Sequence, residues 1–193
     1  MLKKDFLVHT TKQVVSQTFR LGAGLIFCFI ILTASSVLLV RFFNPPFSSF
    51  MVWESNFFQK KIDYSWTPIP NMGKNIALSI VATEDSNFCN HIGIDIKEIY
   101  KVVANEEKRG ASTITQQLAK NLFLWHGRSW PRKIIEMYYA FLMETIIPKR
   151  RILELYLNIV ETSPLTFGVD RASEKIYKKP SNKLTKEQAI RIA

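Results

Sequence analysis

Two neighbouring carboxylates in this sequence stand where a catalytic base could be placed. Glu84 and Asp85 follow the apolar run 76–81, which predicts a packed helix that ends at the acidic pair. Because a helix C-terminus carries partial negative charge, we expect a cation or a hydrogen-bond donor to compensate a carboxylate there. A carboxylate held in this way is a candidate general base, and we assign that role to Glu84. The alternative is an acidic pair at a solvated helix end.

A dense polar block follows at residues 110–121, with seven hydrogen-bonding side chains in ten residues. We expect Ser112 to cap a helix whose inner face is formed by Ile114, Leu118 and Leu122. Gly110 allows close approach of a ligand to the backbone just before it. Another face carries two amides and an ammonium that suit sugar hydroxyls and a phosphate, at Gln117, Lys120 and Asn121. An ordinary capped helix with a solvated side is the alternative.

Two cations and a carboxylate share one face of a later helix. The sequence predicts this helix over residues 130–147, beginning at Ser129 with Pro131 in its first turn. Arg132 and Lys133 precede Glu136 by four and three residues, so the three lie on a single surface. Helical spacing predicts a core face made of Ile134, Ile135, Tyr138, Phe141, Leu142 and Thr145. A surface ion pair worth about 0.3 to 0.5 kcal/mol is the alternative interpretation of the cluster.

Further helices are predicted around these clusters. Asp95 with Glu98 is typical of an N-cap and its reciprocal partner, which starts a helix over 96–104. The lone His91 in the preceding turn is expected to be structural. Residues 149–160 predict a helix with Ile152, Leu155, Tyr156 and Ile159 turned inward, and residues 168–177 predict a shorter helix. Thr185 with Gln188 is typical of a capping box that opens a last helix, which Ala193 cuts short. We find no internal repeat and no β-rich segment, so the domain should be mainly α-helical.

The N-terminal part of the chain predicts a membrane anchor. Residues 21–40 form an uncharged run of 20, enough for a helix to cross a hydrocarbon core of roughly 30 Å. Four cations precede the run, at Lys3, Lys4, Lys12 and Arg20, and predict a cytoplasmic N-terminus and an exported domain. A cleaved signal peptide is the alternative. The aromatic, irregular segment 42–66 should lie at the bilayer surface, or else act as a linker packed against the domain.

Composition limits the remaining classes of function. The 193 residues are 47% hydrophobic, which excludes a disordered chain and allows one domain with a sizeable core. The net charge of +10 suits nucleic acid, anionic lipid or a phosphorylated substrate. The basic residues are spread out and no nucleic-acid-binding motif occurs, so we expect no nucleic-acid partner. Cys28 and Cys89 form neither a disulfide framework nor a metal-ligand spacing.

These clusters together resemble the motifs of peptidoglycan glycosyltransferase family 51, and in particular its members with one membrane anchor and no penicillin-binding domain. The resemblance covers residues 80–193. It rests on four motifs in order: Glu84-Asp85-x-x-Phe88-x-x-His91-x-Gly93, Gly110-x-Ser112-Thr113-Ile-Thr115-Gln116-Gln117-x-x-Lys120-Asn121, Arg132-Lys133-x-x-Glu136 and Arg151-Ile-Leu-Glu154-x-Tyr156-Leu-Asn158. The chain departs from the family at 161–168, where the family has an acidic residue followed by Phe-Gly, and at 171–173.

The resemblance implies a lysozyme-like α-helical head, a smaller membrane-touching jaw and one N-terminal transmembrane helix. It divides the chain into a cytoplasmic segment 1–20, the transmembrane helix 21–40, an aromatic membrane-proximal linker 41–70 and a glycosyltransferase domain 71–193 whose C-terminus looks incomplete. The implied substrate is a lipid-linked disaccharide-pentapeptide, polymerised into glycan strands at the bacterial inner membrane. The membrane itself and proteins of cell-wall synthesis or division are the other partners that it suggests.

Transfer from a lipid diphosphate needs a base for the acceptor hydroxyl and positive charge for the leaving group. Glu84 is the expected base, Lys120, Arg128, Arg132 and Lys133 should neutralise the diphosphate, and Glu136 should orient these cations or a bound metal. The remaining expected substrate contacts come from Asp85, Ser112, Thr115, Gln116, Gln117 and Asn121. One direct displacement would invert the anomeric carbon. No cofactor is required; a divalent cation, magnesium or manganese, is compatible with the diphosphate.

Two other functions fit parts of the pattern. A muramidase-like hydrolase would also use paired carboxylates. The cation cluster argues against it, because a hydrolase of glycan strands has no diphosphate to neutralise. An inactive scaffold that binds wall-synthesis proteins through its span is the second alternative, and the intact Glu84 and Glu136 argue against it.

Overall fold

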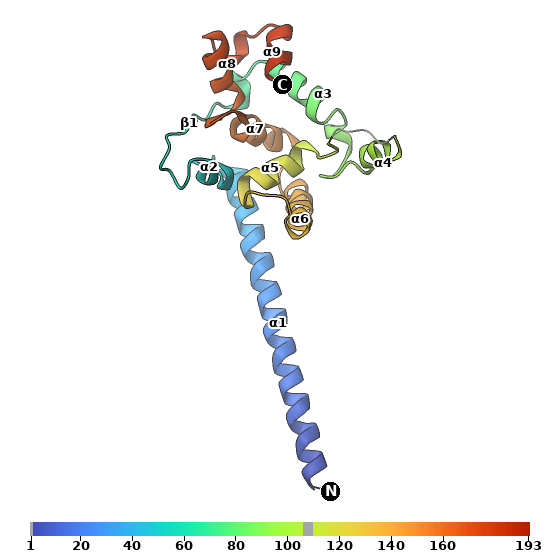
Figure 1. Ribbon diagram of the computed structural model, residues 1–193. Coiled ribbons are helices and arrows are strands. Elements are labelled where there is room, and N and C mark those ends of the chain that lie inside the picture. The colour runs from blue at the N-terminus through green and yellow to red at the C-terminus, as the bar shows by residue number, and fades with distance from the viewer. Residues whose placement is uncertain (1, 106–109) are drawn as a thin grey trace.

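One long helix leads from the N-terminus into a group of shorter helices (Figure 1). The computed structural model describes residues 2–105 and 110–193. Residue 1 and residues 106–109, which belong to the predicted cytoplasmic segment and to the stretch before the polar block, therefore lie outside the described residues. Helix α1 covers Leu2–Phe42 and holds a candidate span at Ser16–Phe42, long and apolar enough to cross a membrane, with a mean hydropathy of 2.6. It includes the predicted span 21–40.

The predicted helices are present within a residue or two of their expected bounds. They are α3 (Lys74–Glu84), α4 (Ile96–Ala104), α5 (Ile114–Phe123), α6 (Trp130–Ile146), α7 (Lys149–Ile159), α8 (Val169–Tyr177) and α9 (Lys186–Ile192), with 3-10 turns at Ile69–Asn71, Phe88–Asn90 and Ser181–Lys183. Helix α5 lies at the centre, against α6, α7 and the short helix α2 (Ser49–Glu54) (Figure 1). Its fully buried Ile114 and Leu118, together with Ile152 and Leu155 of α7, form the middle of the core.

The segment predicted as an irregular aromatic linker contains regular structure. Besides α2, it holds the strand β1 (Asp63–Tyr64), which pairs in parallel with β3 (Thr166–Phe167). β3 also pairs in antiparallel fashion with β2 (Glu161–Ser163), so the sheet order is β1-β3-β2. Strands of two or three residues are too short to show an alternating pattern in the sequence, which is why they were missed. The protein is mainly α-helical, as predicted.

The cap of α5 was assigned to the wrong residue. Thr113, and not Ser112, is the N-cap: its hydroxyl accepts from the backbone N–H of Gln116, whose side chain in turn accepts from the N–H of Thr113. This reciprocal capping box needs a glutamine three residues after the cap, and Gln116 stands at that distance from Thr113 only. Ser112 lies one residue before the cap, and its hydroxyl accepts from Lys133 of α6 instead.

The predicted core face of α6 was only partly right: Leu142 packs against the core and Ile135 and Tyr138 are half-buried, but other members of the face are exposed. Ile134 and Phe141 are 65% and 58% exposed, whereas the buried face holds Arg132, Glu136, Ala140 and Met143. Helix α1 packs along α6, where the hydroxyl groups of Thr33 and Tyr138 lie 2.7 Å apart within the candidate span. Apolar residues on a helix beside such a span need not face a protein core, so helical spacing alone could not identify the buried side.

Candidate active site

Glu84 is the last residue of α3 and is compensated by a hydrogen-bond donor, as expected for a carboxylate at a helix C-terminus. The donor is Gln117 Nε2 of α5, 2.8 Å from Glu84 Oε2. The hydroxyl of Tyr156 of α7 donates to Gln117 Oε1 at 3.0 Å and so fixes which end of the amide faces Glu84. Burial, and then the charges of Glu84 and Asp85, raise the pKa of Tyr156, so its proton stays available for this bond.

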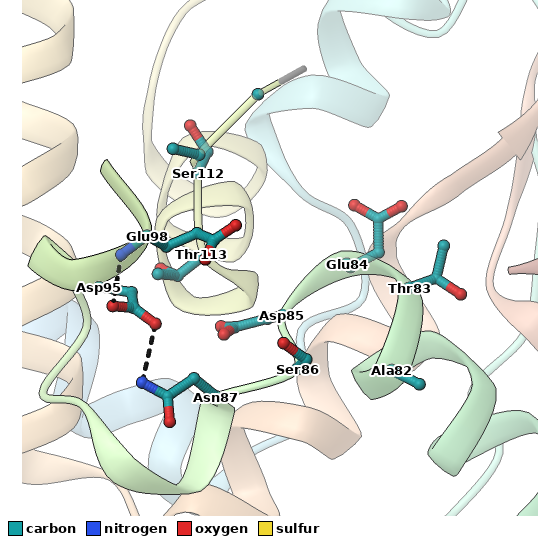
Figure 2. Close-up of a pocket in the computed structure, with 12 residues that line it drawn as sticks. Ala82, Thr83, Glu84, Asp85, Ser86, Asn87, Asp95, Glu98, Ser112 and Thr113 are labelled. Atoms are coloured by element: carbon teal, nitrogen blue, oxygen red, sulfur yellow. Dashed lines mark hydrogen bonds between the residues drawn. The ribbon is translucent and has the colours of Figure 1, made fainter. Parts of the chain in front are cut away.

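Asp85 follows Glu84 in the sequence, but its carboxylate contacts different residues. Its buried carboxylate accepts from His91 Nε2 at 2.9 Å and from the backbone N–H of Ile114 at 3.0 Å. Asp85 therefore joins the end of α3 to the first turn of α5, where the partial positive charge of the helix favours an anion. Figure 2 shows the carboxylates of Glu84 and Asp85 pointing in different directions. The prediction that His91 is structural agrees with this contact, and these contacts give Asp85 a positioning role. Asp85 also lines the pocket beside Glu84, so its contact with substrate stays a prediction.

A small pocket of about 90 Å³ lies beside Glu84. Ser112 faces Glu84 across it, with Asp95 and Glu98 at the start of α4 (Figure 2). Gly110 lines the pocket as well. Asp95 is held in place because its carboxylate accepts from the backbone N–H of Glu98 at 3.0 Å and from Asn87 Nδ2 at 2.8 Å. A hydroxyl group entering this pocket would meet the carboxylate of Glu84 as a proton acceptor.

Glu136 is buried between two cations of its own helix. Its carboxylate accepts from Arg132 Nη1 at 2.9 Å and from Lys133 Nζ, and it is only 3% exposed. Lys133 Nζ also donates to Ser112 Oγ at 3.0 Å, which ties the trio to the wall of the Glu84 pocket. The buried Nε of Arg132 has no hydrogen-bond partner among the described residues. This trio is not an ordinary surface ion pair, because its carboxylate is shielded from water.

A larger pocket of about 310 Å³ lies next to Arg132 of the trio. Three of the predicted cations line it, Lys120, Arg128 and Arg132, with Phe50 of α2 and Trp125 as apolar walls. Lys120 is half-buried, and its Nζ lies 5.9 Å from the centre of the Phe50 ring. Burial lowers the pKa of the Lys120 ammonium, the charges of Arg132 and Lys133 lower it further, and Glu136 opposes them. An anion in this pocket would replace the lost hydration of these cations.

Five predicted substrate ligands line neither pocket. Two of them, Gln117 and Lys133, contact Glu84 and Ser112 of the smaller pocket, and the other three are held by the protein. Thr115 is fully buried and donates to Glu144, while Gln116 is used in the capping box of α5. Asn121 is buried, and its backbone carbonyl accepts from Ser49 of α2. Dense polarity predicted that the block at 110–121 would bind a ligand, but part of it holds α5 in place. The contribution of Tyr156 was not foreseen, since an inward-facing tyrosine in an apolar helix gives no sign of its hydroxyl partner.

Comparison with known proteins agrees with this geometry. The sequence profile of the family described as Transglycosylase matches residues 54–193. The chain belongs to the transglycosylase family. The matched region begins at Glu54, the last residue of α2, and contains all of the predicted site residues. Phe50, which lines the larger pocket, lies just before it.

Several relatives of this transglycosylase chain carry the same name, biosynthetic peptidoglycan transglycosylase. The protein of Pasteurella multocida is 41% identical over 176 residues, which cover 86% of this chain and 71% of the relative. That of Mannheimia succiniciproducens is 41% identical over 189 residues, covering 92% and 78%. That of Haemophilus influenzae strain Rd is 39% identical over 179 residues, covering 87% and 73%. The family suggested by the four motifs is thus confirmed.

Proposed function

We propose that this chain joins the sugars of a lipid-linked peptidoglycan precursor into glycan strands, with Glu84 as the base and the cations around Glu136 as the leaving-group site. As a member of the transglycosylase family it is a peptidoglycan glycosyltransferase. This assignment of the base and the leaving-group site rests on a continuous line of contacts between the two pockets. It runs from the Glu84 pocket through Ser112, Lys133 and Glu136 to Arg132 in the cationic pocket.

The reaction is one displacement at the anomeric carbon of the donor sugar. The acceptor hydroxyl forms the new carbon–oxygen bond and loses its proton to Glu84, while the bond from the anomeric carbon to the diphosphate oxygen breaks. The electron pair of that bond leaves with the diphosphate, whose added charge is met by Lys120, Arg128, Arg132 and Lys133. Because nucleophile and leaving group occupy opposite sides of the carbon, the configuration inverts.

Gln117 positions the base in this scheme. Its amide donates to Glu84 Oε2 at 2.8 Å, and Tyr156 prevents the amide from turning. The second oxygen of Glu84 is then the one that faces the acceptor hydroxyl. Glu136 acts in a comparable way on the other side, since it keeps two cations close together that would otherwise repel each other.

The apolar helix α1 fits a single-pass membrane anchor. The cations before residue 21 favour a cytoplasmic N-terminus, which would place the two pockets outside the inner membrane. The exposed apolar side of α6, with Trp130, Ile134 and Phe141, would then contact the bilayer as the membrane-touching jaw that the family resemblance implies. A lipid-linked substrate suits such a site, because its diphosphate would lie at the membrane surface.

The charge for the leaving group comes from side chains in this proposal. A magnesium or manganese ion, where present, would be carried by the diphosphate of the substrate and not by a protein ligand set. Chelation with EDTA should accordingly leave most of the turnover. Proteins of wall synthesis or division stay candidate partners, and the exposed surface of α1 is where a membrane-bound partner would be sought.

The direct test is incubation of the purified full chain with a labelled lipid-linked disaccharide-pentapeptide in detergent micelles. Transfer predicts long glycan strands and release of the polyprenyl diphosphate. Short glycan produced from preformed strands would instead support the muramidase-like hydrolase, and an unchanged precursor would support a scaffold. Heat-inactivated protein is the control for breakdown of the precursor without catalysis.

A further inference from the structure

We propose that an arginine-lined cleft at the junction of α1 and α7 binds the phosphate of an anionic phospholipid, in the leaflet that faces the two catalytic pockets. The cleft measures about 270 Å³ and is lined by Arg41, Phe42, Pro148, Arg150, Arg151 and Glu154. This inference rests on α1 crossing the membrane, as in the proposed function, but not on the transfer reaction. The bound lipid is neither a substrate nor a product of the enzyme.

The cleft lies where headgroups are expected. Arg41 occupies the last turn of α1, directly after the uncharged run 21–40, and α1 ends at Phe42. A helix that crosses the hydrocarbon core with this run places Arg41 at the level of the lipid phosphates. Phe42 and Phe43 are exposed beside it, as is common for rings in the interfacial zone.

The arginines of the cleft have different tasks. Arg151 is occupied with the protein, since it donates to the carbonyls of Val40 and Phe43 and to Glu154 Oε2 at 2.8 Å. It thereby fastens the end of α1 to α7. Arg41 donates to the carbonyl of Ile146 at 2.6 Å through one Nη, and a guanidinium has five N–H groups, so most of its donors stay available. Arg150 is exposed and can turn toward an anion in the cleft.

Charge favours an anionic ligand over a zwitterionic one. Three arginines line the cleft, and Glu154 is the one acid among its lining residues in the described part of the chain. Glu154 is already paired with Arg151, which leaves the charges of Arg41 and Arg150 uncompensated in the cleft. A phosphate group can accept from both guanidinium groups. A zwitterionic lipid would bring an additional ammonium into this positive environment.

The surface next to the cleft accommodates a lipid chain. An apolar hollow of about 290 Å³ on α1 is lined by Ser35, Leu38, Leu39, Phe42 and Phe43. Phe42 belongs to both cavities, so a phosphate among the arginines would have its acyl chain beside the leucines of α1. A soluble phosphate compound would use only the first cavity. The pairing of a cationic cleft with an apolar hollow is what identifies the ligand as a phospholipid.

The cleft is distinct from the catalytic cations. Arg41 contacts Ile146 at the C-terminal end of α6, whereas Arg132 lies in the first turn of the same helix. At a rise of 1.5 Å per residue, the two positions are about 20 Å apart along α6. Neither Lys120 nor Arg128 lines the lipid cleft.

The test counts lipids bound to the full chain in mild detergent by native mass spectrometry. Phosphatidylglycerol and phosphatidylcholine with the same acyl chains are titrated separately, without any precursor, so a failed transfer reaction would not affect the outcome. We expect phosphatidylglycerol to bind at least tenfold more tightly. Each arginine should contribute about fivefold, so Arg41→Gln/Arg150→Gln should weaken binding about 25-fold. The control Lys183→Gln/Arg191→Gln removes two exposed cations near the C-terminus and should stay within twofold of the unmodified chain.

Two further measurements distinguish a lipid from a soluble phosphate compound and separate weaker binding from misfolding. Arg150→Gln alone alters an exposed side chain and should weaken binding about fivefold with an unchanged melting temperature. Excess glycerol 3-phosphate should not displace the lipid, because it lacks the acyl chains. Equal binding of the two lipids, an unaffected Arg150→Gln variant, or displacement by glycerol 3-phosphate would each overturn the proposal. Tighter binding of undecaprenyl diphosphate than of phosphatidylglycerol would overturn it as well, in favour of a site for the enzyme's own product.

Discussion

Replacing Lys133 with alanine should separate catalysis from folding. Lys133 Nζ contacts Glu136 and Ser112, but a third of the side chain, 33%, is exposed. Loss of so exposed a partner should lower the free energy of unfolding by only about 0.5 to 1 kcal/mol, because Arg132 still holds Glu136 at 2.9 Å. Removing a donor from a developing charge costs about 3 to 4 kcal/mol in the barrier. Turnover should therefore fall about 10²- to 10³-fold in a protein that is still folded.

Replacing Glu136 with glutamine should affect folding as well as catalysis. The carboxylate of Glu136 is buried against two cations, and its loss would leave the buried Arg132 without a counter-ion. Removing one member of a buried ion pair costs about 3 to 5 kcal/mol of stability. In a chain of this size, a loss of that order lowers the melting temperature by roughly 10 °C. We expect this variant to lose both stability and turnover.

The assay measures initial rates on the lipid-linked precursor together with melting temperatures. Lys149→Ala is a matched control, because Lys149 is 29% exposed and pairs at 2.8 Å with Glu144, another buried carboxylate, away from both pockets. It should lose a similar small amount of stability and keep its turnover. Lys133→Arg should recover part of the activity, since charge is kept while geometry changes. Normal turnover by Lys133→Ala, or an equal loss in Lys149→Ala, would refute the reasoning and transfer the leaving-group role to Lys120 and Arg128.

Three further predictions concern the base, the orientation and the pH dependence. Glu84→Gln should reduce turnover about 10²- to 10⁴-fold without a change in melting temperature, and near-normal rates from a folded variant would remove Glu84 from the role of base. A reporter fused after Ala193 should be active only outside the cytoplasmic membrane, whereas cytoplasmic activity would contradict the orientation. Because burial lowers the pKa of Lys120, the charged form required for activity should be lost at a lower pH than for an ordinary lysine. The alkaline limb of kcat/KM should thus lie below pH 10.5, and Lys120→Arg should move it upward; an unmoved limb would show that another group titrates there.

Much of the fold follows from local sequence signals. Cap residues in the sequence predicted the starts of three helices, and each of these caps makes a hydrogen bond in the structure. They are Asp95 with Glu98 for α4, Ser129 with Pro131 for α6, and Thr185 with Gln188 for α9. These devices depend on residues three or four apart, so they can be recognised without knowledge of the tertiary structure. The position of Glu84 at the end of α3 followed in the same way, from an apolar run and what comes after it.

The site was less predictable where a side chain could bind either a ligand or the protein. Thr115 and Gln116 have the chemistry of sugar ligands, yet their partners are Glu144 and the backbone of Thr113. Asp85 likewise bonds to His91 and to the first turn of α5. Which partner each group finds depends on the packing of α3, α5 and α6, and this information is spread over residues far apart in the chain.

The error about the buried face of α6 connects the site with the membrane. A helix that packs in water turns its apolar side inward, but α6 turns Arg132 and Glu136 inward and leaves Ile134 and Phe141 exposed. An exposed apolar side of a helix is stable only if it meets another apolar environment. The contact between Tyr138 and Thr33 places the apolar side of α6 beside the candidate span of α1. One helix would then contact lipid with one side and hold the diphosphate-binding cations with the other. The substrate could reach those cations without its polyprenyl chain leaving the bilayer. We therefore expect a soluble form that lacks residues 1–42 to bind the precursor more weakly, even though every catalytic residue is present.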